Sequence, residues 1–102
     1  MVAPPRPDAR VFAALGDATR LELLARLEDG ALLSATHLAA KAPVSRQAVS
    51  KHLRVLADVG LVEDVWRGRE RLWKLNPEPL HTVAAWIRPL ISQQGPPKAD
   101  PS

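Results

Sequence analysis

The chain has 102 residues, enough for one domain with a single modest core, and carries a formal net charge of +3. Hydrophobic residues make up 46% and charged residues 25%, as is typical of globular proteins, and the absence of cysteine excludes disulfides and thiolate metal sites. No apolar run approaches the roughly 20 residues of a membrane-spanning helix, and residues 1–10 lack the apolar core of a secretory signal, so we expect a cytoplasmic protein.

The two ends of the chain are predicted to lie outside the folded domain. Residues 1–7 contain three prolines and show no periodicity, so we expect a disordered arm. Residues 95–102 read GPPKADPS, a composition typical of a disordered tail. The folded domain is therefore placed at residues 8–94.

Two short helices are predicted next, each after an aspartate in the position of an N-cap. Asp8 precedes a helix that runs to about Leu15, and Asp17 precedes a second helix over residues 18–29. The leucines of the second helix that we expect to be buried are Leu21, Leu23, Leu24 and Leu27. Arg20, in the first turn, is either a surface charge or part of an ion pair at the edge of the core.

A third and a fourth helix are separated by a break of only a few residues. The short apolar segment before them, residues 31–33, is either a loop or a small edge strand. Ser34 is placed to cap a helix over residues 35–42, which Pro43 then interrupts because proline disfavours helical geometry at the preceding residue. Ser45 is placed to cap the next helix. Two short helices joined by a tight turn form the helix-turn-helix pattern.

The fourth helix, ending near Gly60, separates into two faces when it is wound at 100° per residue. Its polar face contains an amide, a hydroxyl and two cations, which are groups that pair with phosphates and base edges: Gln47, Ser50, Lys51 and Arg54. Arg46, at the helix start, suits a backbone phosphate. The residues expected on the apolar face are Ala48, Val49, Leu53, Val55 and Leu56. We expect His52 to pack on that face with one ring nitrogen hydrogen-bonded, His37 to be exposed, and His81 to lie at the surface or at the dimer edge. For His52 and His37 the alternative is a contact with a backbone phosphate. The alternative interpretation is an ordinary solvated helix.

A β-hairpin is predicted after this helix, because two β-prone runs, residues 61–66 and 71–75, flank a turn that contains glycine. The cations that cluster at its tip are Arg67, Arg69 and Arg71. Such a tip can act as a wing that lies along a phosphate backbone or enters a minor groove. Glu70 is a candidate ion-pair partner for one of these arginines. Trp66 and Trp73 are expected in the core rather than stacked on bases.

The basic excess is local. Residues 45–74 contain seven cations and four anions, which accounts for the whole net charge and favours a polyanionic partner. No nucleophile elbow, phosphate-binding loop or carboxylate pair accompanies it, so we expect no catalytic activity.

The last helix, which begins near Asn76 or Glu78, carries an apolar stripe. With Phe12 of the first helix, its residues are the predicted dimer interface: Leu80, Val83, Ala84, Ile87, Leu90 and Ile91. A stripe of this length at the edge of a domain is typical of a surface that meets another subunit. Pro89 is expected to kink or end the helix near Arg88.

Three motifs in this order resemble the ArsR/SmtB family of bacterial winged-helix repressors. They are Leu15-Gly16-Asp17-x-Thr19-Arg20, Ser50-x-His52-Leu53-x-x-Leu56 and Gly60-Leu61-Val62, followed by a wing centred on Gly68. The resemblance implies a mainly α winged helix-turn-helix fold with about five helices and a small β-hairpin. It also implies a homodimer, formed through the first and last helices, that represses transcription from an inverted-repeat operator.

The departures from the family concern its metal sensors. Many members bind metal through cysteines in the third helix, and others through His, Asp and Glu in the last helix. Here Glu78 and His81 have no later acidic or histidine partner, whereas a first-row metal needs about three or four ligands. We therefore expect neither a metal nor a cofactor, and the effector stays unassigned. The sequence predicts a homodimer on double-stranded DNA; the alternative is a winged-helix module that binds protein without specific DNA binding.

Overall fold

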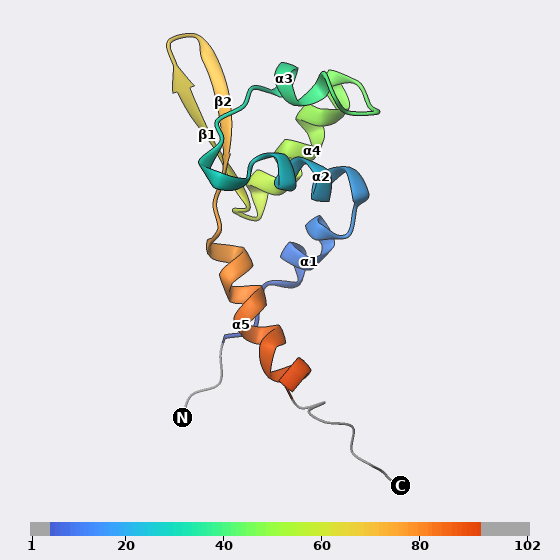
Figure 1. The fold of residues 1–102 in the computed structure, drawn as a ribbon, viewed down its shortest axis with the longest axis vertical. Coiled ribbons are helices and arrows are strands. Elements are labelled where there is room, and N and C mark those ends of the chain that lie inside the picture. Colours follow the sequence, from blue (N-terminus) through green and yellow to red (C-terminus); the bar gives the residue numbers. More distant parts are fainter. Residues whose placement is uncertain (1–4, 93–102) are drawn as a thin grey trace, which may run out of the picture.

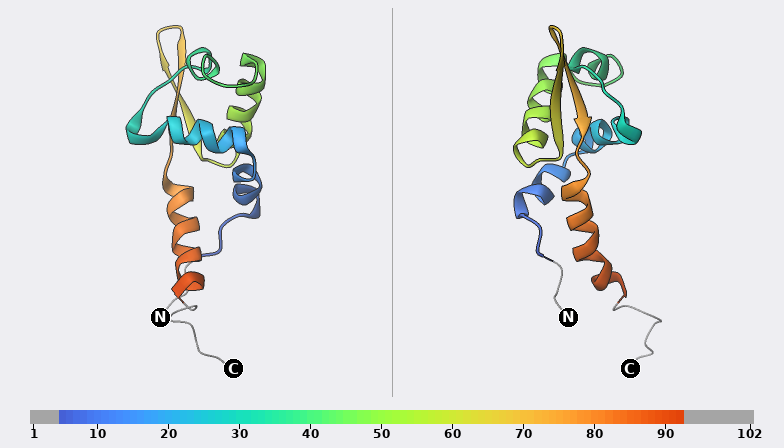
Figure 2. Two further views of the ribbon diagram at one scale, coloured as in Figure 1. Left: turned by 45° about the vertical axis from the view of Figure 1, so that its right-hand side comes forward. Right: turned by 90° about the vertical axis from the view of Figure 1, so that its left-hand side faces the viewer.

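The computed structural model describes residues 5–92, and a two-stranded hairpin stands at one side of its helices, with its tip projecting beyond them (Figure 1). The elements are α1 (Ala9–Leu15), α2 (Ala18–Arg26), a 3-10 turn (Glu28–Gly30), α3 (Ala35–Ala39), α4 (Arg46–Asp58), β1 (Val62–Arg67), β2 (Glu70–Leu75) and α5 (Glu78–Ser92). The hairpin and α5 extend toward opposite ends of the molecule (Figure 2). The predicted tail and residues 1–4 of the predicted arm lie outside the described residues, and Pro7 of the arm is buried.

The first four α-helices begin where the predicted caps stand. Each cap side chain accepts a hydrogen bond from a backbone N–H in the first turn: Asp8 from Arg10 (2.8 Å), Asp17 from Arg20 (3.0 Å), Ser34 from His37 (3.0 Å) and Ser45 from Ala48 (3.1 Å). These bonds satisfy donors that a helix start leaves without partners. The Arg20 N–H also holds the pKa of the Asp17 carboxyl below its ordinary value, because it stabilises the charged form.

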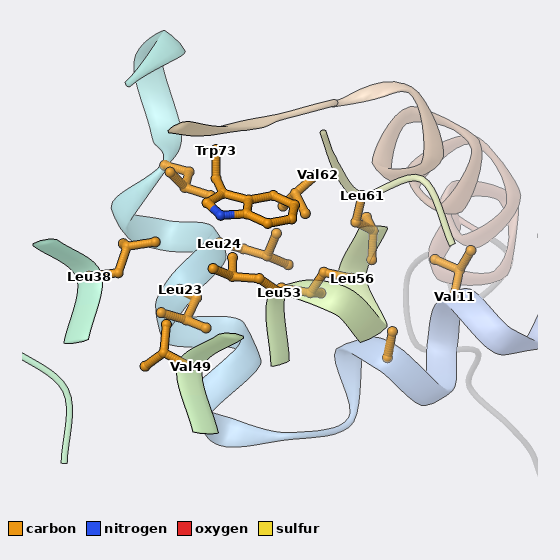
Figure 3. Packing of buried hydrophobic residues seen from close by; sticks show 12 residues of the cluster. Val11, Leu23, Leu24, Leu38, Val49, Leu53, Leu56, Leu61, Val62 and Trp73 are labelled. Atoms are coloured by element: carbon orange, nitrogen blue, oxygen red, sulfur yellow. The ribbon is translucent and has the colours of Figure 1, made fainter. Parts of the chain in front are cut away.

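The core is formed by α1, α2, α3 and α4 together with the base of the hairpin (Figure 3). Its fully buried side chains are Leu23, Leu27, Leu38, Val49, Leu53, Leu56 and Leu61. Two apolar predictions are wrong: Leu21 is 51% exposed and Val55 is 39% exposed. Leu21 shares the outward face of α2 with Ala25, four residues later, and Val55 lies four residues after Lys51 on the polar side of α4. On the helical wheel, each of these two positions lies next to the buried stripe but outside it.

The hairpin pairs Val62 with Leu75 and Arg67 with Glu70, and it turns through two residues at Gly68, whose φ is +62°. The segment at residues 31–33 is neither a full strand nor a free loop, since Leu33 forms one antiparallel bridge with Trp73 (N···O 2.8 and 3.1 Å). Trp73 is buried, as expected.

The prediction for Trp66 is wrong, because this side chain is 60% exposed. The register places Trp66 on the same face of the hairpin as the buried Trp73, so the expected face is correct. The hairpin, however, extends past the helices toward its tip (Figure 1), and Trp66 lies in the half that the core does not cover. Leu72, on the opposite face, is buried as well, so the simple two-face alternation also fails.

Helix α5 continues through Pro89 to Ser92, so of the two outcomes expected for Pro89, a kink or a helix end near Arg88, the helix end is wrong. Because proline has no backbone N–H, α5 loses one hydrogen bond at Pro89, while the other residues of its last turn keep their N–H donors. Only residues 90–92 of the helix follow the proline. None of the fifteen described residues of α5 is buried. Among the helices of residues 5–92, none is long and apolar enough to cross a membrane.

Candidate nucleic-acid interface

The outward face of α4 presents the polar side chains that its amphipathic pattern predicts. The Ser45 cap starts the helix, and Val49, Leu53 and Leu56 fix it to the core. Five polar residues of the helix are all exposed: Gln47, Ser50, Lys51 and Arg54 on the opposite side, and Arg46 at the helix start, where it lines the groove described next. The helix therefore carries three cations and two neutral hydrogen-bonding groups on one accessible surface.

A groove of about 860 Å³ separates this face from the wing. Its residues come from the start of α3, from α4 and from the hairpin, and they include Ser34, Thr36, Arg46, Ser50, Arg54, Asp58, Trp66, Arg69, Glu70 and Arg71. Among these residues four arginines face two carboxylates, so the groove has a positive excess. Asp58 lies four residues after Arg54 and places a carboxylate at the far end of the polar face.

The three wing arginines have different surroundings. Arg67 precedes the turn, Arg69 is its second residue, and both are exposed. Arg71 donates from Nε to Oδ2 of Asp64 at 2.8 Å, so its ion-pair partner is Asp64 rather than Glu70. Its guanidinium carbon also lies 4.5 Å from the ring centroid of Trp73. Arg71 is thus fixed by packing and pairing, whereas the tip arginines extend into solvent.

Comparisons with known proteins agree with this architecture. Residues 15–65 match the profile of a family described as a helix-turn-helix domain. The HTH-type transcriptional regulator Rv2034 of Mycobacterium tuberculosis is 45% identical over 89 residues, which cover 82% of this chain and 81% of that protein. An ArsR-like transcriptional regulator from Rhodococcus sp. RHA1 is 44% identical and has a TM-score of 0.77 over 83% of this chain and 77% of that one. The chain belongs to the ArsR family of winged helix-turn-helix transcriptional regulators.

Two more distant relatives support the same family and fold. YuzN of Bacillus subtilis, also named as an HTH-type transcriptional regulator, is 37% identical over 84 residues, covering 76% of this chain and 91% of that protein. The winged helix-turn-helix domain of Mb0332 from Mycobacterium bovis, described as homodimeric, shares the fold with a TM-score of 0.65 at 23% identity, over 84% of this chain and 78% of that one. The chain shown in Figure 1 is therefore a DNA-binding transcriptional regulator. Its winged fold is the one that the three sequence motifs implied.

A hydrogen-bonded arginine connects α4 to α1. Arg20 donates from Nε to the carbonyl of Ala14 (2.7 Å) and from Nη2 to that of Ala13 (3.3 Å), and its Nη1 lies 3.2 Å from Nδ1 of His52. A guanidinium has only donors, so Nδ1 is the acceptor in this hydrogen bond. His52 is half-buried with one nitrogen bonded, as predicted. Arg20, however, is not a free surface charge, and it forms no ion pair with any residue between 5 and 92.

Replacing Arg20 by alanine is expected to lower the free energy of unfolding by about 1.5–3 kcal/mol, because hydrogen bonds from a charged donor to part-buried acceptors are lost. Urea denaturation measures the change. Arg10→Ala is the matched control: it removes a guanidinium that is 73% exposed and pairs with Asp8, and it should change stability little. If the two variants unfold at the same urea concentration, the bonds of Arg20 do not hold α1, α2 and α4 together.

The predicted dimer residues form a surface along α5 that continues onto α1. Leu90 is 46% exposed, Ile91 is 65% exposed and Ala84 is exposed, whereas Leu80, Val83 and Ile87 are half-buried. Phe12 is exposed and contacts α5 through Trp86, with ring centroids 6.0 Å apart at an interplanar angle of 64°. Trp86 was missing from the predicted set because it lies beside the apolar stripe on the helical wheel.

Two histidines lie outside the core. His37 and His81 are exposed, as expected. Across residues 5–92 the structure brings together no group of three or more His, Cys, Asp or Glu side chains that could hold a metal ion.

Proposed function

We propose that the regulator represses transcription as a homodimer that binds an inverted-repeat operator in double-stranded DNA. The observation that carries the proposal is the accessible polar face of α4, whose three cations lie beside a positively charged groove and the wing. Between Arg46 and Arg54 no carboxylate interrupts this face. A helix with such a face matches the way a recognition helix reads base edges in the major groove.

The side chains of α4 divide by their position on the helix. Gln47 suits a bidentate contact with adenine, and Arg54 and Lys51 suit guanine or a phosphate. Ser50, between them, can bond to either. Arg46 lies at the helix start and faces the groove, so we assign it to a backbone phosphate.

The wing would then supply phosphate contacts from Arg67 and Arg69, which are exposed at its tip. Arg71 was predicted as a third wing contact. Its ion pair with Asp64 and its stacking on Trp73 support a different role, in which it orders the hairpin surface beside the DNA. We keep it in the interface as a positioning residue.

The dimer would form through α5 and α1. The exposed apolar side chains Phe12, Leu90 and Ile91 support this, as does the absence of any buried residue among the fifteen of α5. The Mycobacterium bovis domain with the same fold is homodimeric. A two-fold dimer would place its two α4 helices about 34 Å apart, which is one turn of B-DNA.

Selection of bound duplex fragments from the source genome tests the proposal. We expect a recovered site with two inverted half-sites, and an affinity that falls steeply as salt rises, because neutralised phosphates release counterions. Deleting the site in front of a reporter should raise expression if the regulator is a repressor. Failure to recover any fragment at low salt would instead support a protein-binding module.

Arg54→Ala is expected to weaken operator binding by about 1–3 kcal/mol and to reduce discrimination against a duplex with a changed half-site. Fluorescence anisotropy with both duplexes measures the two effects. Arg69→Ala is the matched comparison, since loss of a phosphate contact should weaken both duplexes equally. An Arg54→Ala protein that binds and discriminates like the parent would remove Arg54 from the set of base-reading residues.

A further inference from the structure

An exposed tryptophan on the wing lines the groove between α4 and the hairpin. Trp66 is 60% exposed although it shares a face of the hairpin with the buried Trp73. Tryptophan is enriched at binding interfaces, because its ring offers a large apolar surface and its N–H can donate a hydrogen bond. The groove wall that it forms belongs to the surface proposed to face DNA, and the inference below rests on that proposed function.

The indole of Trp66 is backed by an ordered cation. Arg71 is the cross-strand partner of Trp66, and its guanidinium carbon is 6.0 Å from the indole centroid. The same guanidinium also contacts Trp73, at 4.5 Å from the ring centroid, and the Asp64 carboxylate. This arrangement supports one side of the Trp66 ring without covering it, so most of the ring surface stays available.

Charge indicates what occupies the groove. Its lining contains Arg46 and Arg54 from α4 and Arg69 and Arg71 from the wing, against the two carboxylates of Asp58 and Glu70. A polyanion complements that excess. The polyanion must also offer an apolar surface, because the wall formed by Trp66 is aromatic. A DNA strand satisfies both requirements, since its charged phosphates alternate with deoxyribose rings.

We propose that Trp66 is a DNA contact of the wing, and that its indole packs on a deoxyribose of the strand that enters the groove between α4 and the hairpin. The ring contributes apolar contact and one N–H donor, and it neutralises no phosphate. Trp66 therefore adds affinity that is independent of base sequence and insensitive to salt. The arginines around it supply the salt-dependent part of the binding.

The test compares Trp66→Ala, Trp66→Phe and Arg69→Ala with the parent protein on two duplexes, a selected operator and a mixed-sequence duplex of equal length. We expect Trp66→Ala to weaken both by about ten-fold, a size typical of a lost aromatic contact with nucleic acid. Its slope of log affinity against log salt should equal that of the parent. Arg69→Ala should lower the slope by about one. Trp66→Phe, which retains an aromatic face, should recover most of the lost affinity.

A second measurement follows the indole itself. Acrylamide quenching of tryptophan fluorescence should decrease when the parent protein binds the duplex, and this decrease should disappear in Trp66→Phe. Because Trp66 is exposed, we expect all three variants to retain the parental circular dichroism spectrum and unfolding midpoint.

Each outcome has a separate meaning. If the parent protein binds neither duplex at low salt, the proposed function itself fails. If the parent binds but Trp66→Ala binds equally well, or if quenching is unchanged in the complex, the assignment of Trp66 is overturned while the proposed function stands. A Trp66→Ala protein with a reduced salt slope would also overturn it, because the indole would then act only by holding Arg71.

Discussion

Replacing Leu53 by alanine is expected to lower the free energy of unfolding by about 2–5 kcal/mol, the range for truncating a fully buried leucine. Leu53 has no exposed surface and lies on the inner face of α4, between Val49 and Leu56 (Figure 3). The loss combines apolar contacts with a cavity that rigid neighbours do not fill. A domain of this size has about 5–15 kcal/mol of stability in total, so the variant should retain only part of it. Urea denaturation at a fixed protein concentration measures the change.

Val55→Ala is the control on the same helix, two residues away. Val55 is 39% exposed, and alanine has the higher helix propensity, so we expect a change within about 0.5 kcal/mol. Comparable losses from the two substitutions would show that the inner face of α4 is not where the core is built. The comparison also tests the corrected position of Val55, which the helical wheel alone had placed on the apolar side.

Local signals were sufficient for most of the fold. The caps at Asp8, Asp17, Ser34 and Ser45 depend on hydrogen bonds between neighbours in sequence, so the residue types alone located four helix starts. Gly60, at φ +79°, follows the end of α4, where a residue without a β-carbon is favoured. The hairpin followed from its two β-prone runs and the glycine between them.

Predictions that depend on how separate elements pack against one another were less successful. Trp66 and Trp73 have the same sequence signal and the same face of the hairpin, and only the reach of the helices beneath them makes one exposed and the other buried. Leu21 failed for a similar reason at the edge of the α2 stripe. The partners of Arg20 come from α1 and α4, and no periodicity in the sequence indicates that the three elements converge.

The polar face of α4 could be predicted as a surface, because exposure of one helix face follows from burial of the other. The contacts on the wing and the groove beside this face could not be predicted. The sequence gives no indication that Asp64, rather than the adjacent Glu70, pairs with Arg71, since that pairing depends on strand register. The groove between α4 and the wing is likewise a product of packing, and it converts two separate basic segments into one continuous surface.

In the proposed dimer, Leu90→Glu is expected to convert the protein to a monomer and to weaken binding to a complete operator by about 10²–10⁴-fold. Leu90 is 46% exposed on α5, in line with the apolar stripe, so a dimer would bury it. A carboxylate buried there without a partner opposes association. Loss of the second α4 then removes the gain that comes from binding two linked half-sites together. Sedimentation equilibrium measures the mass, and anisotropy measures the affinity.

The matched control is Ala85→Glu, which adds the same charge to the same helix on the side away from the stripe and should leave both the dimer and its affinity unchanged. A duplex with one half-site provides a further check, because monomeric Leu90→Glu should bind it as tightly as each parental subunit does. If Leu90→Glu sediments as a dimer, α5 is not the interface. If it is a monomer that still binds the complete operator with parental affinity, the two recognition helices do not act as a pair, and the inverted-repeat mode of binding is wrong.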